Sequence, residues 1–379
     1  MTSLRPQSLY VHVPFCPSIC PYCDFHKMKR HNPLVARYLD RLEETSRELA
    51  ARFPGPLTTV YFGGGTPSML EDAELERIFT FLERDWRLSA ATEVTLEADP
   101  LTFGPERLRF FRSLGVTRLS IGLQSLSDPV LEFLGRRHDG TEGRKAVTDA
   151  LEADFEVTAD LITAVPGQDA ARDLHGLAAT GVPHVSVYSL TVEPFTPFAL
   201  RGVEVDESQA ADDFALATEI LAGYGLERYE VSNHARPGHE SRHNQAYWHG
   251  THYLALGPSA ASFEPAEGLV GVRRTNPLIR GWLLGEAPEE QPVDAVEHTL
   301  ESLMTALRTS RGLDLAALVR RGGVDPRSAF SGPLEETLRH GLLELEGGRL
   351  RATPDGLVRL DAVLRRFFAE RETAQQAGG

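Results

Sequence analysis

The three cysteines of the chain lie on one short segment, and their spacing carries the strongest chemical signal in the sequence. Cys16, Cys20 and Cys23 form a C-x3-C-x2-C pattern within 379 residues. Thiolates are soft metal ligands, and an odd number of cysteines in a reducing compartment is not a disulfide framework. A four-iron cubane normally takes four protein ligands, so three thiolates would leave one iron open to a small molecule. The segment therefore favours an iron–sulfur site.

Two other interpretations of the cysteine segment remain open. The thiolates are compatible with a closed zinc site in which His12 or His26 supplies the fourth ligand, because zinc ligands often stand two to four residues apart. The cysteines could also be small buried core residues without ligands. Their clustering favours the iron–sulfur interpretation over both.

An alternation of predicted strands and helices positions these cysteines and several other polar residues. Short apolar runs predict strands at Leu9–Val13, Thr58–Phe62, Glu93–Glu97, Arg118–Leu123, Phe155–Ile162 and His184–Leu190. Helical periodicity separates them, as at Leu34–Arg52, Leu75–Asp85 and Pro105–Leu114. In parallel sheets and barrels, ligands bind at the carboxyl ends of the strands. The residues that fall at or near those ends are the cysteines, Gly63–Gly65, Glu97, Gln124 and Asp160.

The pattern changes at about residue 288 and indicates a second, smaller unit. Helices are predicted at Val293–Thr309, Leu313–Arg321, Pro333–Leu342 and Asp355–Glu370, and a hairpin at Leu343–Arg351 turns at Gly347-Gly348. The first three helices and the β-hairpin are typical of a winged-helix-like α+β domain, and the fourth helix follows the hairpin. We expect a barrel over 1–288, this domain over 289–372, and a disordered tail over 373–379.

The composition excludes several classes of protein. The net charge of −15 argues against a general nucleic-acid-binding surface. Hydrophobic residues make up 41% and charged residues 25%, which is ordinary for a globular protein. The start of the chain lacks the apolar core of a signal peptide, and no run of about 18 apolar residues occurs. We therefore expect a cytoplasmic protein with at most transient membrane association.

The cysteine motif resembles that of the radical S-adenosylmethionine superfamily. Within that superfamily, Tyr10-Val-His-Val-Pro-Phe-Cys16 and Cys20-Pro-Tyr-Cys23-Asp-Phe25 are similar to the oxygen-independent coproporphyrinogen oxidase-like branch, over nearly the whole chain. The resemblance implies a partial (β/α)6 barrel with a C-terminal domain. It also implies a [4Fe-4S] cluster on the three cysteines, whose open iron is chelated by S-adenosylmethionine and whose electron can cleave that molecule to a 5′-deoxyadenosyl radical.

The same resemblance assigns contacts to S-adenosylmethionine. The implied residues are Tyr10, Tyr22, Gly64, Gly65, Thr66, Glu97, Gln124, Arg136 and Asp160. Each also has a purely structural interpretation: a plain βα turn for the glycines, a helix cap for Glu97, and ion pairs for Arg136 and Asp160. Ala164 stands where members of the branch usually have glycine.

Two kinds of protein make up this branch, the oxygen-independent coproporphyrinogen III oxidases and the HemW-type haem chaperones. The oxidases resemble C-x3-C-x2-C-x-C, whereas Phe25 replaces the last cysteine here, and Cys16 lies too near the start of the chain for the N-terminal arm of an oxidase. The chaperones carry H-N-x-x-Y-W, which matches His243, Asn244, Tyr247 and Trp248. These features favour a haem chaperone, with the oxidase as the alternative.

The H-N-x-x-Y-W segment is chemically suited to haem. An imidazole can be an axial iron ligand, and tyrosine and tryptophan offer flat apolar faces with a polar edge. The alternative is that these side chains only fill the core. Nearby histidines are further candidate ligands at positions His234, His239, His249 and His252. We expect this haem-associated extension to span about residues 228–288.

The resemblance also implies partners. A haem chaperone needs haem and an acceptor haemoprotein, and radical chemistry would need an electron donor such as flavodoxin or ferredoxin. If the protein is an enzyme, it would be an oxidoreductase of the coproporphyrinogen dehydrogenase type. No residue stands out as a general base, so no catalytic residue is assigned.

Overall fold

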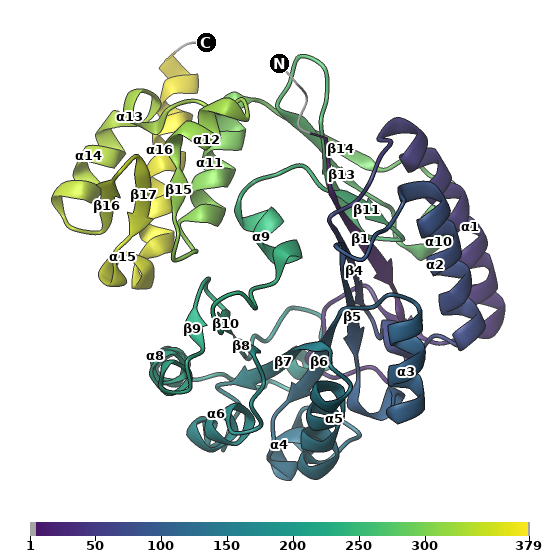
Figure 1. Ribbon diagram of the computed structural model, residues 1–379. Coiled ribbons are helices and arrows are strands. Elements are labelled where there is room, and N and C mark those ends of the chain that lie inside the picture. Colours follow the sequence, from purple (N-terminus) through teal and green to yellow (C-terminus); the bar gives the residue numbers. More distant parts are fainter. Residues whose placement is uncertain (1–4, 378–379) are drawn as a thin grey trace.

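A curved sheet of nine strands forms the centre of the computed structural model, which describes residues 5–377 (Figure 1). The strand order is β11-β1-β4-β5-β6-β7-β8-β10-β9. Six of these strands are the predicted parallel series. They are β1 (Ser8–Val13), β4 (Thr59–Gly64), β5 (Glu93–Ala98), β6 (Arg118–Gln124), β7 (Glu156–Thr163) and β8 (His184–Ser189). The predicted partial barrel is therefore confirmed.

The helices that connect the successive strands cover the outer face of this sheet (Figure 1). The helices between the strands are α1 (Asn32–Arg52), α2 (Asp72–Trp86), α3 (Pro105–Ser113), α4 (Asp128–Phe133), α5 (Gly140–Glu152), α6 (Ala170–Ala178), α7 (Pro197–Leu200) and α8 (Glu207–Gly223). Two 3-10 helices, Pro67–Met69 and Pro100–Thr102, follow β4 and β5. The sheet is open, since β11 and β9 form its two edges.

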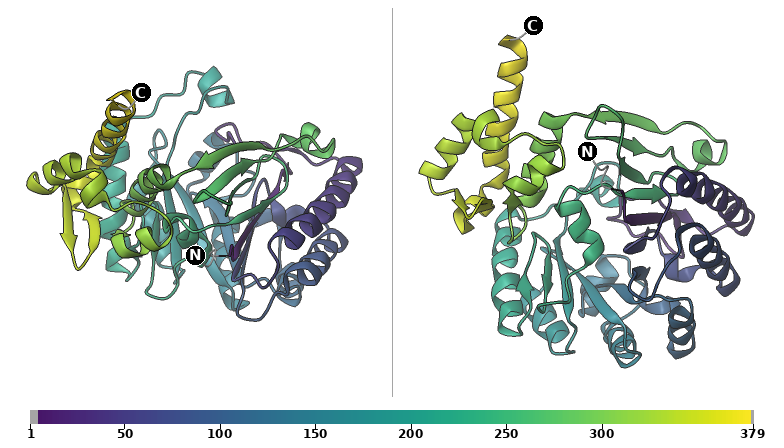
Figure 2. Two further views of the ribbon diagram at one scale, coloured as in Figure 1. Left: turned by 90° about the horizontal axis from the view of Figure 1, so that it is seen from above. Right: turned by 45° about the horizontal axis from the view of Figure 1, so that its top comes forward.

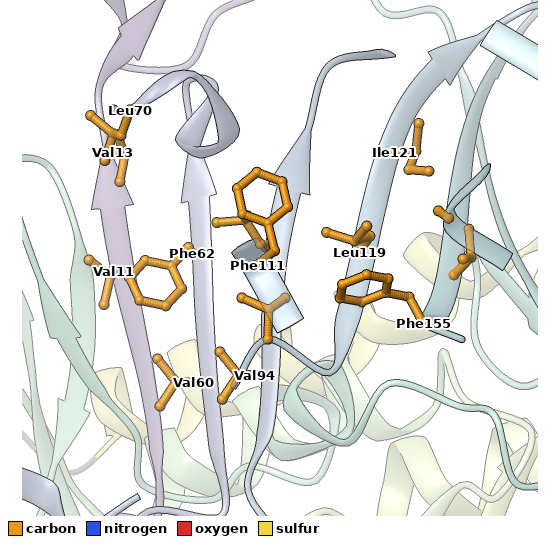
Figure 3. Packing of buried hydrophobic residues seen from close by; sticks show 14 of the residues in the cluster. Val11, Val13, Val60, Phe62, Leu70, Val94, Phe111, Leu119, Ile121 and Phe155 are labelled. Atoms are coloured by element: carbon orange, nitrogen blue, oxygen red, sulfur yellow. The ribbon is translucent and has the colours of Figure 1, made fainter. Parts of the chain in front are cut away.

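Alternation along the strands separates the core from the functional face. Successive side chains of a strand point to opposite sides of the sheet. Val11, Val60, Phe62, Val94 and Leu119 are buried in the layer between the strands and the helices (Figure 3). The residues between them in sequence therefore point into the barrel, and many of those are polar.

Three short strands extend the parallel series at both edges. β11 (Leu254–Leu256) pairs parallel to β1, while β10 (Asn233–Ala235) pairs antiparallel to β8 and β9 (Glu227–Arg228) pairs antiparallel to β10. A helix between these edges, α9 (Arg242–Trp248), lies on the inner side of the sheet (Figure 1). Residues 228–256 thus link the two edges of the barrel.

A separate three-stranded antiparallel sheet follows β11. Its members are β12 (Ala261–Glu264), β13 (Gly271–Thr275) and β14 (Glu289–Val293), with α10 (Ile279–Leu283) between the last two. Because β14 pairs with β13 over residues 289–293, this sheet continues past the boundary predicted at 288.

The C-terminal unit lies on the opposite side of the molecule from α1 and α2 (Figure 2). Its elements are α11 (Ala295–Ala306), β15 (Leu313–Asp314), α12 (Leu315–Arg320), α13 (Pro326–Ala329), α14 (Ser331–Arg339), β16 (Leu343–Glu346), β17 (Arg349–Ala352), α15 (Pro354–Val358) and α16 (Leu360–Ala377). A core of its own includes Leu300, Leu303, Leu350 and Phe367. Helices around a small sheet with a hairpin match the predicted winged-helix-like architecture.

Two predictions for this unit need correction. The last helix is divided into α15 and α16, which are separate on either side of Arg359. The predicted disordered tail is wrong for 373–377, because α16 continues to Ala377. Alanine and glutamine, which make up four of the residues 373–377, are good helix formers, so a helix already anchored on a core can propagate through them. Residues 378–379 lie outside the described residues.

Among residues 5–377, no helix is both long enough and apolar enough to cross a bilayer.

Candidate cofactor site

The cysteine loop lies at the carboxyl end of β1. Two short strands hold its ends together, β2 (Phe15–Cys16) and β3 (Met28–Lys29). A turn in which the Cys23 amide donates to the Cys20 carbonyl at 3.2 Å brings those two residues close. All three cysteines are free thiols and line one cavity of about 440 Å³. The predicted metal-ligating residues are therefore grouped at the edge of the barrel where ligands are expected.

Positive groups accompany the thiols. Arg136 Nη1 lies 3.5 Å from Cys20 Sγ, and Arg136 Nη2 donates to Asp99 Oδ2 at 2.9 Å. The Lys27 ammonium donates to the Cys23 carbonyl. Burial raises the pKa of Cys16 to about 11, so a thiolate there needs a cation that replaces its proton. This donor set fits a thiolate-bound metal cluster.

The histidines of the zinc interpretation are bonded elsewhere. Both ring nitrogens of His12 have partners, the Tyr10 hydroxyl at 3.0 Å and the His26 carbonyl at 2.8 Å. His26 Nε2 accepts from the Ile279 amide at 3.2 Å. Across residues 5–377, no three His, Cys, Asp or Glu side chains are grouped so that they could hold a single metal ion. A cubane places each thiolate on a different iron and does not need the sulfurs to meet at one ion.

The glycine-rich turn after β4 packs directly against the cysteine-bearing segment. The Gly65 amide donates to the Val13 carbonyl at 2.7 Å, and the Thr66 amide donates to the Phe15 carbonyl at 2.8 Å. Gly64 has φ +106°, and a Cβ there would lie 2.3 Å from the His12 ring. The glycines therefore allow a close backbone approach that any side chain would prevent. Gly64, Gly65 and Thr66 all line the cavity.

Two carboxylates point into the same cavity from the inner face of the sheet. Glu97 accepts from the Tyr61 hydroxyl at 2.9 Å and from the Gly64 amide at 3.0 Å, and Asp160 accepts from the Ser120 hydroxyl at 3.3 Å. Burial raises the pKa of Glu97 to about 7 and that of Asp160 to about 6. Neither carboxylate forms an ion pair within the described part of the chain. The pair is suited to hydrogen-bond donors or positive charge on a ligand.

Most residues that were predicted to contact S-adenosylmethionine meet in this cavity. Its lining includes Tyr22, Gly64, Gly65, Thr66, Glu97, Gln124, Arg136 and Asp160. Gln124 reaches it from a β-bulge with φ +68°. Tyr10 is outside the lining, and its ring packs 6.1 Å from that of Tyr61. It therefore lies beside Tyr61 on the same face of the sheet, next to the cavity.

Several residues that line the cofactor cavity were not predicted from the sequence. Tyr61, Arg118, His184 and Tyr188 also line the cavity, and each belongs to an inward-facing position of a central strand. Arg118 is buried and donates to the Thr158 hydroxyl at 3.2 Å and to the His239 carbonyl at 2.9 Å. The signal that would identify them is the strand alternation, counted from the valines of the outer face.

Ala164 adopts a left-handed backbone conformation, as the glycine usual at this position in the resembling branch suggests. Its φ is +57°, and its amide donates to Asp213 Oδ2 at 2.9 Å. Left-handed backbone is costly for alanine and free for glycine. The hydrogen bond to a buried carboxylate helps to hold this conformation at the end of β7.

The four residues of the H-N-x-x-Y-W segment face different surroundings. Only Asn244 lines the cofactor cavity, while Trp248 borders a different hollow. His243 is 1% exposed, and its two ring nitrogens lie 2.8 Å from the Thr59 hydroxyl and 2.8 Å from the Tyr247 hydroxyl. A haem iron at His243 would have to displace one of these bonds, so its assignment as a haem ligand stays a prediction.

Comparison with known proteins gives this site its context. The family model for the radical SAM superfamily matches residues 10–175, and that for the HemN C-terminal domain matches residues 293–359. A protein of Synechocystis named Heme chaperone HemW is 35% identical and covers 84% of this chain and 81% of the relative. Proteins of the same name from Mycobacterium tuberculosis H37Rv (35% identical, 95% and 94% covered) and Escherichia coli K12 (30% identical, 98% and 100% covered) match nearly end to end.

The chain belongs to the HemW family of radical SAM proteins. Membership of the HemW family agrees with the prediction made from Phe25, which stands where the oxidases have a fourth cysteine. The Phe25 side chain lines the cofactor cavity and is 63% exposed. The solved structure of coproporphyrinogen III oxidase (HemN) from Escherichia coli has the same fold, with a TM-score of 0.81 over 96% of this chain and 90% of the other. At 23% identity, this similarity shows a common fold only.

Proposed function

We propose that this protein is a haem chaperone that holds a [4Fe-4S] cluster and S-adenosylmethionine, binds haem, and delivers haem to acceptor haemoproteins. The observation that carries the proposal is one cavity that gathers the three free cysteines, Arg136, and the carboxylates of Glu97 and Asp160, which form no ion pair within the described residues. It occurs in a chain whose near full-length relatives are named haem chaperones. Haem and an acceptor haemoprotein are the partners that this function requires.

Different residues of the chain would bind the cluster and S-adenosylmethionine. Cys16, Cys20 and Cys23 would hold the cluster and leave one iron for S-adenosylmethionine. Glu97 and Asp160 offer acceptors for ligand hydroxyl or ammonium groups, and Arg136 balances the negative charge of the thiolates. Such a cluster supplies an electron that can cleave a sulfonium. If this occurs, flavodoxin or ferredoxin is the class of electron donor that we propose.

Coproporphyrinogen III oxidase is the alternative function, because the branch that the cysteine motif resembles also contains these oxidases. Phe25 in place of a cysteine argues against it, as does the higher identity to the chaperones. The two functions predict different behaviour towards the same molecules. A chaperone binds haem in a fixed stoichiometry, whereas the oxidase turns over coproporphyrinogen III.

Anaerobic reconstitution followed by haem titration tests the proposal. Wild-type protein is expected to gain a cluster and to bind about one haem per chain. The Cys16→Ala, Cys20→Ala, Cys23→Ala triple variant is expected to lose the cluster and keep haem binding, because the proposed haem residues lie outside the cysteine loop. Wild-type protein that binds no haem, or that converts coproporphyrinogen III under reducing conditions with S-adenosylmethionine, would contradict the chaperone function.

A further inference from the structure

A second cavity, of about 330 Å³, lies at the end of the barrel opposite the cysteines. Ser8 and Thr59, the first residues of the parallel strands β1 and β4, form part of its wall. Residues of α9 and of the turn that follows this helix form another part, and Arg321 borders the cavity from the C-terminal unit. Figure 1 shows α9 between the barrel strands and α11. We call this cavity, which lies where three parts of the molecule meet, the basic pocket.

The lining of the basic pocket has an unusual charge for this chain. Its ionisable side chains are Arg5, Arg242, Arg321, His249, His252 and His298. No Asp or Glu of residues 5–377 belongs to the lining, although the chain has a net charge of −15. Apart from Ala246 and Val270, the other lining residues are polar or glycine. A concave surface of this kind attracts anions and offers little contact area to a large apolar ligand.

Two arginines of the basic pocket are held by backbone carbonyl groups and not by carboxylates. Arg5 donates to the Pro56 carbonyl, and Arg321 Nη1 donates to the His249 carbonyl. Within residues 5–377, neither arginine forms an ion pair with an acidic side chain. A carbonyl group orients a guanidinium without neutralising it, so the positive charge stays available for an anion.

Each of the three guanidinium groups also keeps nitrogen atoms without a protein partner. Among the described residues, no hydrogen bond is made by Nε or Nη2 of Arg321, by Nη1 of Arg5 or by Nη1 of Arg242. Arg242 is the most constrained of the three, because its Nη2 donates to the Ala91 carbonyl at 2.8 Å and its Nε lies 3.7 Å from Glu93 Oε2. Donors from three separate segments are therefore left for the oxygens of one ligand.

A buried hydroxyl supports the same conclusion. Ser8 is 5% exposed and faces the inside of the barrel, because Leu9, the next residue of β1, is buried in the core on the outer face. The Ser8 hydroxyl has no hydrogen-bond partner within the described part of the chain. A buried polar group without a partner costs free energy unless a ligand or water satisfies it.

The environment of His249 is a further sign of positive potential. Burial lowers the pKa of this imidazole, and the charges of Arg321 and of two other arginines lower it further. A bound anion would offset this repulsion between positive groups.

We propose that the basic pocket binds a small, multiply charged oxyanion of the phosphate class, held by arginines at the junction of the barrel, α9 and the C-terminal unit. Three guanidinium groups suit a ligand with more than one negative charge, and polar walls suit a ligand without a large apolar part. The bound anion joins Arg321 to Arg5 and Arg242 and so stabilises the contact of the C-terminal unit with the barrel. The inference is independent of haem binding, so the failure of either leaves the other intact.

Titration calorimetry of the cluster-loaded, full-length protein with pyrophosphate tests the site. Wild-type protein is expected to bind about one pyrophosphate per chain and to gain thermal stability, because a ligand that binds only the folded state stabilises it. Arg321→Gln is expected to bind pyrophosphate about tenfold more weakly, as the loss of one charge-assisted contact predicts. Arg320→Gln is the matched control with wild-type affinity, because it removes the same charge from an exposed neighbour that does not line the pocket.

A second variant and a second ligand keep the test independent of folding in Arg321→Gln. Ser8→Ala removes only a hydroxyl and is expected to weaken pyrophosphate binding about threefold, the effect of one hydrogen bond. Citrate, whose negative charges are carboxylates, is expected to bind the wild type more weakly than pyrophosphate. The absorbance of the cluster is expected to stay constant during both titrations, because the basic pocket lies at the opposite end of the barrel.

Several results would overturn the assignment. Wild-type affinity in both Arg321→Gln and Ser8→Ala would place the anion elsewhere. An equal loss in Arg320→Gln, or equal stabilisation by sodium chloride at matched ionic strength, would indicate general screening of charge. A cluster absorbance that changes with pyrophosphate in the wild type and in Arg321→Gln would place the anion at the cluster. Tighter binding of citrate would refute the phosphate class, and the absence of both heat and thermal stabilisation with pyrophosphate would refute the site.

Discussion

Glu97 and Asp160 show how single residues tie ligand binding to stability. Both carboxyl groups have a pKa raised by burial, so the folded protein holds protons that the unfolded chain releases. For Glu97 the pKa rises from 4.5 to about 7. The folded state is therefore favoured by this group at low pH, and that contribution is lost as pH rises from about 4.5 to about 7.

We predict that Glu97→Gln removes part of this pH dependence. The free energy of unfolding of the ligand-free wild type should fall as pH rises from 5 to 8. In the variant this fall should be smaller by on the order of 2 kcal/mol. Chemical denaturation at a series of pH values measures this. Glu76→Gln, at an exposed carboxylate of α2, serves as the control and should keep the wild-type slope. An unchanged slope in Glu97→Gln would show that Glu97 does not titrate in this range.

At Gly65, the constraint is steric, because the neighbouring backbone leaves no room for a side chain. A Cβ at this position would lie 2.6 Å from the Phe15 carbonyl oxygen and 2.8 Å from that of Val13. Both are backbone atoms of the cysteine-bearing segment and cannot rotate away.

We predict that Gly65→Ala lowers the free energy of unfolding by about 2–4 kcal/mol and prevents stable cluster assembly. Thermal denaturation and the iron content after reconstitution measure the two effects. Gly223→Ala, at the end of α8 where no atom lies within 4 Å of the added Cβ, should be neutral or slightly stabilising. Equal stability of the two variants would contradict the role assigned to the close approach.

At the scale of elements, α9 lies between the inner sheet face and the C-terminal unit (Figure 1). Ser241 caps the helix by accepting from the Asn244 amide at 3.2 Å, and Glu93 of β5 accepts from the His243 amide at 3.0 Å. The His243 imidazole then bridges the hydroxyls of Thr59 and Tyr247. This chain of bonds fixes α9 against β4 and β5.

His243→Ala is therefore predicted to act on stability rather than on iron coordination. Loss of the two bonds should lower the free energy of unfolding by about 2–4 kcal/mol, while the spectrum of bound haem stays that of the wild type. Urea denaturation and a visible spectrum of the haem complex measure the two quantities. Wild-type stability together with an altered haem spectrum would instead make His243 the iron ligand.

The sequence predicted the long elements of the fold and missed the short ones. The six central strands and the helices that cover them follow from hydrophobic periodicity, and the glycines and acids at strand ends marked the cofactor cavity. The strands β9, β10 and β11 have only two or three residues, too few for a periodic pattern. Residues such as Arg118 and His298 acquire their surroundings only from tertiary contacts between distant segments.

At the scale of the whole molecule, the chain combines two sites at opposite ends of one barrel. The cofactor cavity is built from the barrel strands, their loops and Asn244 of α9, whereas a second cavity at the other end of the barrel is also lined by His298 and Arg321 of the C-terminal unit. The Ser310 amide also donates to the Tyr229 carbonyl at 3.0 Å and links that unit to the barrel. The C-terminal unit thus forms one wall of this second cavity.

Transfer of haem to an acceptor tests the central claim most directly. Cluster-loaded protein carrying one haem would be mixed with an excess of an apo-haemoprotein, and the acceptor's absorption spectrum would be followed under anaerobic conditions. We predict that haem leaves the donor and appears in the acceptor, and that the same preparation forms no protoporphyrinogen IX from coproporphyrinogen III. Haem that stays on the donor, together with turnover of coproporphyrinogen III, would contradict the chaperone function and support the oxidase.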